Sequence, residues 1–430
     1  MALSPSGALV VIHQVGERVR RGGTVRRRAR RVAALGLGTL LVMTSLAPDA
    51  QAQGPRLDRR ELQRSLDEIP KGGIVGAYSA VRDGWQRWRG AAGLADLDTK
   101  RPTRPDMYHR IGSITKTFVA TAVLQQVERG RIQLDAPVET YQPGLLPDRR
   151  ITVRMLLNHT SHLGDYDGVL LTSPDSLEEL RVRQFTDEEL VRLGLEAGPT
   201  GEPGQLPGSY SNTNYIVLGL LLDKVTGMSA ERYITRHVIE RAGLRHTFFP
   251  RTSHLPQPHS KAYTSAFGSF PLRDFSVFNM SWAGTAGAMV STMEDLNRFF
   301  EALFAGRLIS QARLAEMRTT VPITPGAGVT DTFEYGLGLV AYDVPCGRLW
   351  GHDGGVIGMV TLSVATLDGG RQASSGLNTT WHPGSEPGQN AWIIHTFGAV
   401  CGTGDAAEAA RSGQPSAEIP LIDAYAPWRR

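Results

Sequence analysis

The feature that most constrains the fold is the order in which strand-like and helix-like segments follow one another. Residues 72–81 and 85–93 flank an Asp83-Gly84 turn and predict a β-hairpin. Strand character returns only late in the chain, in segments 333–344, 348–352, 359–370 and 371–380. Because strands from the two ends enclose a mostly helical middle, we expect an α/β fold of the α+β type. Its antiparallel sheet would be built from both chain ends and flanked by helices, with a mostly helical subdomain against one side.

Five segments have the apolar spacing that is typical of helices: 56–69, 114–130, 214–227, 291–306 and 391–400. In the second of these, the apolar face is formed by Phe118, Val119, Val123, Leu124 and Val127. The helix is expected to stop at Gly130. In the fourth, Thr292 and Asp295 have the spacing of a capping box, which predicts a helix start there.

The first 52 residues have the composition of a secretory signal. Arginines in 26–31 form a positive region, 32–47 is apolar, and small residues precede a cleavage site near Ala52-Gln53. A retained anchor helix is the alternative, but the apolar run is shorter than the ~20 residues that span a bilayer. We therefore expect a secreted, extracytoplasmic protein without a stable membrane anchor. Its folded domain would cover 53–402, and the tail 403–430, rich in Ala, Gly, Pro and Ser, would be disordered.

The charge distribution excludes one class of partner. The formal net charge is +4, but residues 1–52 hold eight arginines against two acidic residues. The remaining 38 basic and 40 acidic residues give a net charge of −2. The mature domain therefore has no overall basic field for nucleic acid.

The chain has two cysteines, Cys346 and Cys401. In an oxidising compartment we expect them to form one disulfide, and two buried thiols are the alternative. Export favours the disulfide. Neither cysteine has the histidine-rich neighbourhood that would suggest a nucleophile.

The sharpest local signal for chemistry is Ser113 followed by Lys116 at the start of a predicted helix. One helical turn brings positions i and i+3 onto one face, so the lysine amine can approach the serine hydroxyl. Partial burial at a helix start lowers the pKa of a lysine and makes it a usable base. The chain has five lysines against 41 arginines, so a lysine here suggests a need for a deprotonatable group. A capping serine and a surface lysine are the alternative.

Tyr210 and Asn212 are the second candidate pair, in a loop before a helix. The phenol can relay protons, and the amide can orient a substrate carbonyl. Both residue types are also ordinary in loops.

The third candidate is the run 349–359, which is expected to contain the end of one strand, a tight glycine-rich stretch and the start of another. A strand edge of small residues, with Asp353 and Gly354, would let a substrate backbone pair alongside. The Gly355 amide would then join the Ser113 amide as an oxyanion hole. A plain hairpin with glycines at the turn is the alternative.

Together, "SITK" (113–116), "YSN" (210–212) and "HDG" (352–354) resemble, in order and separation, the three elements of the serine penicillin-recognising enzymes. These comprise the class C β-lactamases, the D-alanyl-D-alanine carboxypeptidases and related esterases. The resemblance covers roughly residues 60–402 and is closest to the exported carboxypeptidases with Tyr-x-Asn and His-x-Gly motifs. It includes a cysteine pair placed like the two cysteines of this chain.

The resemblance implies that Ser113 attacks a carbonyl and forms an acyl-enzyme. Lys116 and Tyr210 would share the general-base and general-acid work. Asn212 would hold the acyl amide and Trp282 would line the cleft. His352 would stand where relatives have Lys or His on the third strand. The resemblance implies no cofactor, and as partners it implies peptide, ester or β-lactam small molecules, with cell-wall peptidoglycan as a further candidate.

Three positions depart from the carboxypeptidase pattern. Those enzymes have Thr on both sides of the motif glycine and an Arg after "YGLGL", groups thought to grip the terminal carboxylate. The corresponding positions here are Asp353, Gly355 and Val340. An ionised Asp353 should repel a free carboxylate. It could instead pair with a substrate ammonium, as in an aminopeptidase acting on D-amino acids, or the leaving group could be neutral, or Asp353 could point away and pair with an arginine.

The leading expectation is therefore an exported, D-alanyl-D-alanine carboxypeptidase-like serine peptidase. An esterase, amidase or D-aminopeptidase of the same family is the alternative. A non-catalytic cell-wall binding protein is a second alternative, which the intact serine and lysine disfavour. A zinc site from His159, His162, Asp165 and Asp167 is not expected, because relatives have a similar segment without metal.

Overall fold

The computed structural model describes residues 57–266, 268–326 and 328–402. The predicted signal segment 1–52 and the predicted tail 403–430 lie outside these described residues. Within them, no helix is long and apolar enough to cross a membrane.

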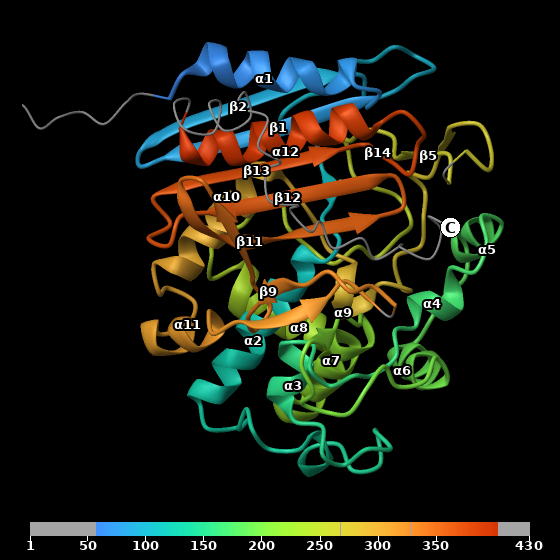
Figure 1. Ribbon diagram of the computed structural model, residues 1–430, viewed down its shortest axis with the longest axis vertical. Coiled ribbons are helices and arrows are strands. Elements are labelled where there is room, and N and C mark those ends of the chain that lie inside the picture. Colours follow the sequence, from blue (N-terminus) through green and yellow to red (C-terminus); the bar gives the residue numbers. More distant parts are fainter. Residues whose placement is uncertain (1–56, 267, 327, 403–430) are drawn as a thin grey trace, which may run out of the picture. The chain divides into compact units, whose positions relative to one another are not determined.

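A nine-stranded sheet joins the two ends of the described chain (Figure 1). In spatial order its strands are β2 (Gln86–Gly93), β1 (Gly76–Asp83), β13 (Arg371–Leu377), β12 (Met359–Ala365), β11 (Gly347–Val356), β10 (Val340–Val344), β9 (Phe333–Tyr335), β8 (Val321–Thr324) and β4 (Gly208–Ser209). The early strand β1 pairs with the late strand β13 along its length, from Ala77 opposite Leu377 to Asp83 opposite Arg371. The predicted sheet from both chain ends is thus confirmed.

One edge of the sheet differs from the prediction of a purely antiparallel arrangement. The two-residue strand β4 leaves the helical region and pairs parallel to β8, with Gly208 opposite Ile323. A segment of two residues is too short to show a strand pattern in the sequence. It pairs with β8 because the chain returns to the sheet there after a series of helices. The smaller strands are β3 (His109–Arg110) with β7 (Val290–Ser291), and β5 (Tyr263–Thr264) between β6 (Arg273–Asp274) and β14 (Thr379–Thr380).

Helices cover both faces of the sheet (Figure 1). The terminal helices α1 (Arg59–Lys71) and α12 (Glu386–Cys401) lie together on one face, and α10 (Met293–Phe304) packs on β1 and β13 from the other. The remaining helices are α2 (Ile114–Glu128), α3 (Val153–Leu157), α4 (Asp167–Leu170), α5 (Ser176–Leu180), α6 (Asp187–Glu196), α7 (Thr213–Thr226), α8 (Ala230–Ile234), α9 (Gly284–Gly287) and α11 (Gln311–Met317), with a 3₁₀ turn at Val138–Thr140 and a π-helical turn at Thr235–Ile239. The Thr292 side chain accepts a hydrogen bond from the Asp295 amide, which confirms the predicted cap of α10.

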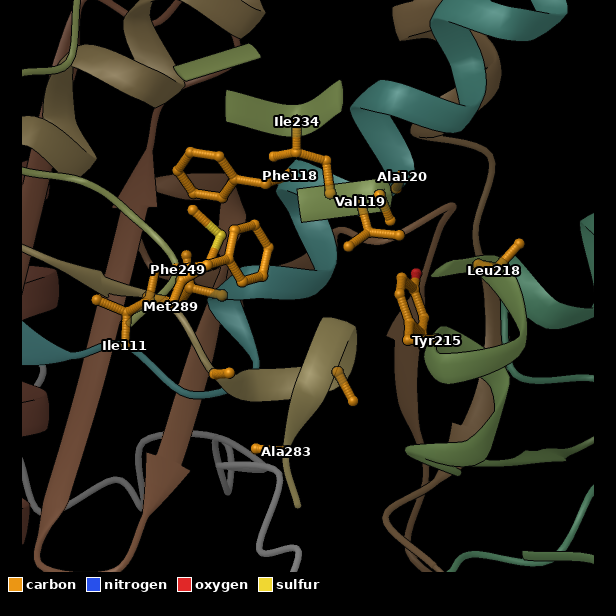
Figure 2. Packing of buried hydrophobic residues seen from close by; sticks show 14 of the residues in the cluster. Ile111, Phe118, Val119, Ala120, Tyr215, Leu218, Ile234, Phe249, Ala283 and Met289 are labelled. Atoms are coloured by element: carbon orange, nitrogen blue, oxygen red, sulfur yellow. The ribbon is translucent and has the colours of Figure 1, made fainter. Parts of the chain in front are cut away.

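Helix α2 is the centre of the core rather than a surface helix with one apolar face. Every residue from Ile114 to Gln126 is buried, because α9, α7 and α8 pack around it together with strand β11. Figure 2 shows Phe118 and Val119 among the side chains of this core. The Phe118 ring stacks on Phe299 of α10 at 3.6 Å between centroids. A helix enclosed in this way holds the residues at its start rigidly.

Strand β11 runs through the glycine-rich stretch without a break. Gly354 lies opposite Thr361 and Gly355 opposite Val360 of β12, and the turn comes later, at Ile357-Gly358. The prediction that the strand ends before the glycines of the run 349–359 is therefore wrong in position, because the strand ends after them. The cross-strand pairing with β12 keeps the glycines extended, whereas Gly358, with φ of 78°, occupies the left-handed conformation that a turn requires.

The two cysteines are bonded, with 5.4 Å between their Cα atoms. Cys346 lies in the turn between β10 and β11, and Cys401 ends α12. The disulfide ties the last helix to the sheet hairpin that leads into the "HDG" motif.

Candidate active site

Helix α2 brings Ser113 and Lys116 into direct contact at its first turn. The Lys116 Nζ donates hydrogen bonds to Ser113 Oγ at 2.9 Å, to Asn212 Oδ1 at 2.6 Å and to the Ala286 carbonyl at 2.8 Å. The three acceptors come from α2, the start of α7 and α9, so the amine is fixed from three sides. This geometry is that of a nucleophile held by its base.

The environment of Lys116 makes it a base near neutral pH. Burial lowers its pKa to about 7, against the opposing effect of the nearby carboxylates of Asp165, Asp167 and Asp353. An amine with such a pKa is largely unprotonated in slightly alkaline solution and can accept the Ser113 proton.

The second motif enters the site from the edge of the sheet. Pairing of β4 with β8 places Tyr210, whose amide donates to the Thr324 carbonyl at 3.0 Å, and α7 begins directly after Asn212. Asn212 connects two sets of charges: its Oδ1 accepts from Lys116, and its Nδ2 donates to Asp165 Oδ2 at 3.1 Å and Asp167 Oδ2 at 2.9 Å.

Tyr210 lies between the lysine and a histidine. The Lys116 Nζ lies 4.9 Å from the centre of its ring, and His159 stacks on the ring at 4.1 Å between centroids. Burial raises the pKa of Tyr210 well above its ordinary value, and Ser113 opposes this rise. The buried hydroxyl has no hydrogen-bond partner among the described residues. It is therefore a neutral phenol, available to a reacting group.

The backbone of the third motif, at Gly354 and Gly355, lies very close to the backbone at Gly112 and Ser113. A Cβ on Gly354 would lie 2.1 Å from the Ile111 carbonyl oxygen and 2.6 Å from the Ser113 nitrogen. A Cβ on Gly112 would lie 2.7 Å from the Gly355 nitrogen. Only glycine fits these two positions, because the backbone at Gly354 and Gly355 lies against the backbone at Gly112 and Ser113, the close approach that the predicted oxyanion hole would need.

His352 is buried and neutral. Burial lowers its pKa to about 3, and the charge of Lys116 adds to this effect. Its Nδ1 lies 2.5 Å from the Asp353 carbonyl oxygen, which can only accept, so Nδ1 carries the proton. Its Nε2 then accepts a hydrogen bond from the Tyr335 hydroxyl at 2.9 Å. With both nitrogens engaged, His352 acts by fixing the strand and Tyr335.

Asp353 and Trp282 are both buried side chains, and the lining of the cleft by Trp282 stays a prediction. Asp353 Oδ1 accepts a hydrogen bond from the Tyr342 hydroxyl at 3.0 Å, and its charge reaches Lys116 and Tyr210. Trp282 precedes α9 and packs edge-on to Phe278 at 6.4 Å. Its indole nitrogen has no hydrogen-bond partner among the described residues.

Two contributions to the site had not been assigned from the sequence. No pattern in the sequence indicates that the Ala286 carbonyl would accept a hydrogen bond from Lys116. Asp165 and Asp167 had been considered only as metal ligands, together with His159 and His162. The structure separates that set: His162 bonds to Thr200 Oγ1 and the Gln205 carbonyl, whereas His159 Nδ1 contacts Asn214 and the Ser211 amide. In the described part of the chain, no group of three or more His, Cys, Asp or Glu side chains is arranged to hold a metal.

Comparison with known proteins finds similar folds among hydrolases. A D-stereospecific amidohydrolase from a Streptomyces species is 37% identical, with a TM-score of 0.70 over 78% of this chain and 98% of that chain. The D-amino acid amidase from Ochrobactrum anthropi SV3, complexed with L-phenylalanine amide, is 28% identical, with a TM-score of 0.69 over 78% of this chain and 97% of that chain.

A penicillin-binding protein is similar at the level of sequence. Penicillin-binding protein 4* of Bacillus subtilis (strain 168) is 28% identical over 324 residues, which are 72% of this chain and 69% of that protein. Residues 59–393 match the family described as Beta-lactamase. With its β-lactamase-like fold and its serine and lysine in contact, the chain is a serine hydrolase that belongs to the Beta-lactamase family.

Proposed function

We propose that the protein hydrolyses the amide bond of small D-aminoacyl compounds that have a free α-ammonium group, through an acyl-enzyme on Ser113. The observation that carries this proposal is the acidic pair Asp165 and Asp167. Both carboxylates accept hydrogen bonds from Asn212 Nδ2, and the other end of the same amide contacts Lys116.

The acidic pair is suited to a cation. Burial raises the pKa of both carboxyl groups, and for Asp167 the neighbouring Asp165 raises it further. Asp167 Oδ1 is buried and has no hydrogen-bond partner among the described residues. An ammonium group placed there would satisfy this oxygen and lower both pKa values, so a positively charged substrate is stabilised where a neutral one is not.

The position of the pair also fits an α-amino group. In an aminoacyl substrate the ammonium nitrogen is two bonds from the carbonyl carbon that Ser113 attacks. Asn212 connects the acidic pair to the Ser113–Lys116 contact, so the pair belongs to the same site as the reacting serine.

The reaction then proceeds by acyl transfer. Neutral Lys116 takes the proton of Ser113 Oγ as the oxygen attacks the carbonyl carbon, and the amides of Ser113 and Gly355 stabilise the oxyanion. When the C–N bond breaks, the leaving amine takes a proton from Lys116, with the Tyr210 hydroxyl as the relay. A water molecule then attacks the ester, and its proton returns through the same groups as Ser113 and the free amino acid are released.

This proposal replaces the leading expectation of a carboxypeptidase. Val340 is buried in β10, opposite Gly351, and supplies no cation for a terminal carboxylate. Asp353 places a negative charge on the strand that a substrate would pair with. The hydrogen bond from Tyr342 makes Asp353 less suited to an ammonium than Asp167, so we assign that role to the pair.

Preference for the D-configuration is supported by the relatives. The two similar structures described above are a D-stereospecific amidohydrolase and a D-amino acid amidase. The disulfide between Cys346 and Cys401 supports export, because such bonds persist in oxidising compartments.

The test is a substrate panel in which only one group changes at a time. We expect D-phenylalanine amide to be hydrolysed, whereas its L-enantiomer, N-acetyl-D-phenylalanine amide and acetyl-D-Ala-D-Ala should react far more slowly. Ser113→Ala should abolish all turnover. If the N-acetylated amide reacts as well as the free amine, or acetyl-D-Ala-D-Ala is the better substrate, the proposal is wrong.

A pair of variants separates the two candidate anchors. Asp167→Asn should lower kcat/KM for D-phenylalanine amide by about 10- to 150-fold, the value of a lost charged hydrogen bond. It should change the hydrolysis of a neutral p-nitrophenyl ester much less. Asp353→Asn is the matched control, since it also removes a charge that acts on Lys116 but lies outside the acidic pair. The reverse result would assign the ammonium to Asp353.

A further inference from the structure

A cavity lies at the outer edge of the sheet, away from Ser113. It has a volume of about 440 Å³ and is formed by β1, β2, α10 and the first residue of α1. Strand β2 is the end of the sheet, and β1, β13 and β12 separate it from β11. The cavity is thus independent of the hydrolase site.

The lining of this cavity is strongly basic. Five arginines contribute to it: Arg59, Arg82, Arg87, Arg89 and Arg298. The acidic residues of the lining are Glu294 and Glu301, so the formal charge is +3. This contrasts with the net negative charge of the chain after residue 52.

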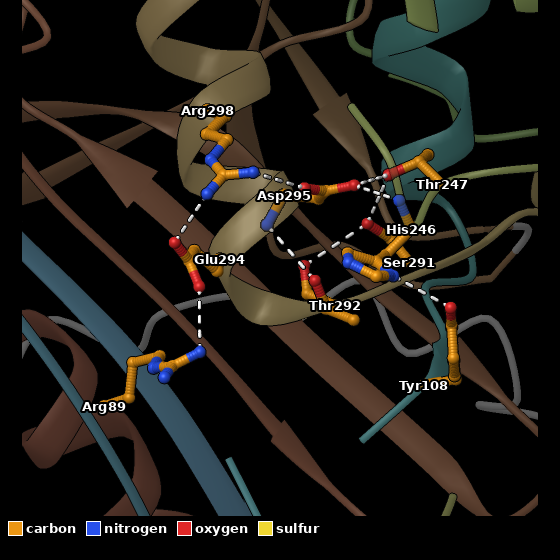
Figure 3. A network of polar contacts seen from close by, with 9 residues as sticks. All are labelled: Arg89, Tyr108, His246, Thr247, Ser291, Thr292, Glu294, Asp295 and Arg298. Carbon is orange, nitrogen blue, oxygen red and sulfur yellow. Dashed lines mark hydrogen bonds and ion pairs between the residues drawn. The ribbon is translucent and has the colours of Figure 1, made fainter. Parts of the chain in front are cut away.

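Both carboxylates of the lining are already shared between two arginines. Glu294 contacts Arg89 at 3.0 Å and Arg298 at 2.7 Å, as Figure 3 shows. Glu301 forms ion pairs with Arg82 and, at 3.4 Å, with Arg307. Glu294 and Glu301 are therefore each paired with two arginines and do not neutralise Arg59 or Arg87.

Arg59 and Arg87 are the unneutralised pair. In the described part of the chain, neither has a carboxylate within ion-pair distance. The Arg59 side chain lies against the backbone of Arg87, since Arg59 Nη2 donates to the Arg87 carbonyl at 2.9 Å. Two guanidinium groups without an ion-pair partner raise the local positive potential of the cavity.

We propose that this cavity binds a multiply charged anion with phosphate or carboxylate groups. Guanidinium groups match the paired oxygens of both anions, and the charge of +3 is complementary to a ligand with two or three negative charges. The volume is in the range of small-molecule sites.

The test uses the full chain and two probes, inorganic pyrophosphate and citrate, in calorimetric titrations at low ionic strength. Each probe represents one source of the anionic groups, so their relative affinities distinguish phosphate from carboxylate ligands. We expect binding of at least one with a dissociation constant of about 1 mM or tighter, weakening as salt is added. No binding of either probe at ten times that concentration would overturn the proposal.

Two double variants make the result specific. Arg59→Gln with Arg87→Gln should weaken binding at least tenfold with little loss of stability, because neither side chain loses an ion pair and the hydrogen bond that Arg59 loses is exposed. Arg60→Gln with Arg64→Gln removes the same charge from exposed positions of α1 outside the cavity lining and should leave binding unchanged. Equal losses in both variants would mean general charge attraction and would refute a built site. Hydrolysis at Ser113 should be the same in all of these proteins.

Discussion

The strongest prediction concerns the protonation of Lys116. Its pKa of about 7 means that roughly three quarters of the amine is neutral at pH 7.5, compared with about 0.1% for an ordinary lysine. Burial therefore increases the population of the active base several-hundredfold. The acylation rate should rise with pH to a midpoint near 7 and then level off.

The perturbation is Lys116→Met, which keeps an unbranched side chain of similar length but removes the amine. A positioned general base contributes about 10²–10⁴-fold, so acylation at pH 9 should fall by that factor. At pH 5 only about 1% of wild-type Lys116 is neutral, so the deficit of the variant should shrink by about 100-fold. The variant itself should show no midpoint near pH 7.

The assay is the pre-steady-state burst of nitrophenol from a p-nitrophenyl ester with a neutral acyl group, followed from pH 5 to 9. Such a substrate leaves the acidic pair empty, so titration of Lys116 is seen without ammonium binding. A constant ratio between wild type and variant across this range would refute the role of Lys116. A rate that is still rising without levelling off at pH 9 would instead point to Tyr210 as the base, because burial raises its pKa.

Three further predictions follow from the surroundings of the site. Gly354→Ala should slow acylation at least 10²–10³-fold, as the loss of an oxyanion donor does, because the new Cβ would lie 2.6 Å from Ser113 N. Acylation is measured with a fluorescent penicillin or as an ester burst, and an unchanged burst would contradict the close approach of Gly354 to Ser113. Removing the disulfide by Cys346→Ser with Cys401→Ser should lower the free energy of unfolding by about 4 kcal/mol, measured in urea, and reduced wild-type protein should match it. Asp353→Thr should increase hydrolysis of acetyl-D-Ala-D-Ala, and no gain would count against charge repulsion as the reason for poor carboxylate binding.

Local geometry made part of the site predictable from the sequence. The spacing of Ser113 and Lys116 on one helical turn is enough to place their contact, and the hydrogen bond between them is present. The contact between Asn212 and Lys116, by contrast, cannot be predicted from the local sequence. It depends on α7 packing beside α2, and the family resemblance, rather than any periodicity, led us to expect it.

Other features depend on tertiary contacts that no short segment encodes. Asp165 and Asp167 lie 45 or more residues before Asn212 and face it only because the loop before α4 lies next to the start of α7. In the sequence they follow His159 and His162 closely, a spacing that suggests a metal site and conceals the pairing with the amide. The glycines of β11 predict a break when only local preference acts, but pairing with the partner strand β12 keeps them extended.

The acidic pair also links substrate binding to catalysis. In the empty site, Asp165, Asp167 and Asp353 all raise the pKa of Lys116, against the effect of burial. An ammonium group bound to the pair cancels part of this negative field, so the pKa of Lys116 should fall when substrate binds. Linkage requires the reverse as well: loss of the Lys116 proton should tighten binding of the cationic substrate. For D-phenylalanine amide, the midpoint of the kcat profile should therefore lie at a lower pH than that of kcat/KM. This displacement should disappear in Asp167→Asn and persist in Asp353→Asn; equal midpoints in the wild type would mean that the ammonium binds outside the field of Lys116.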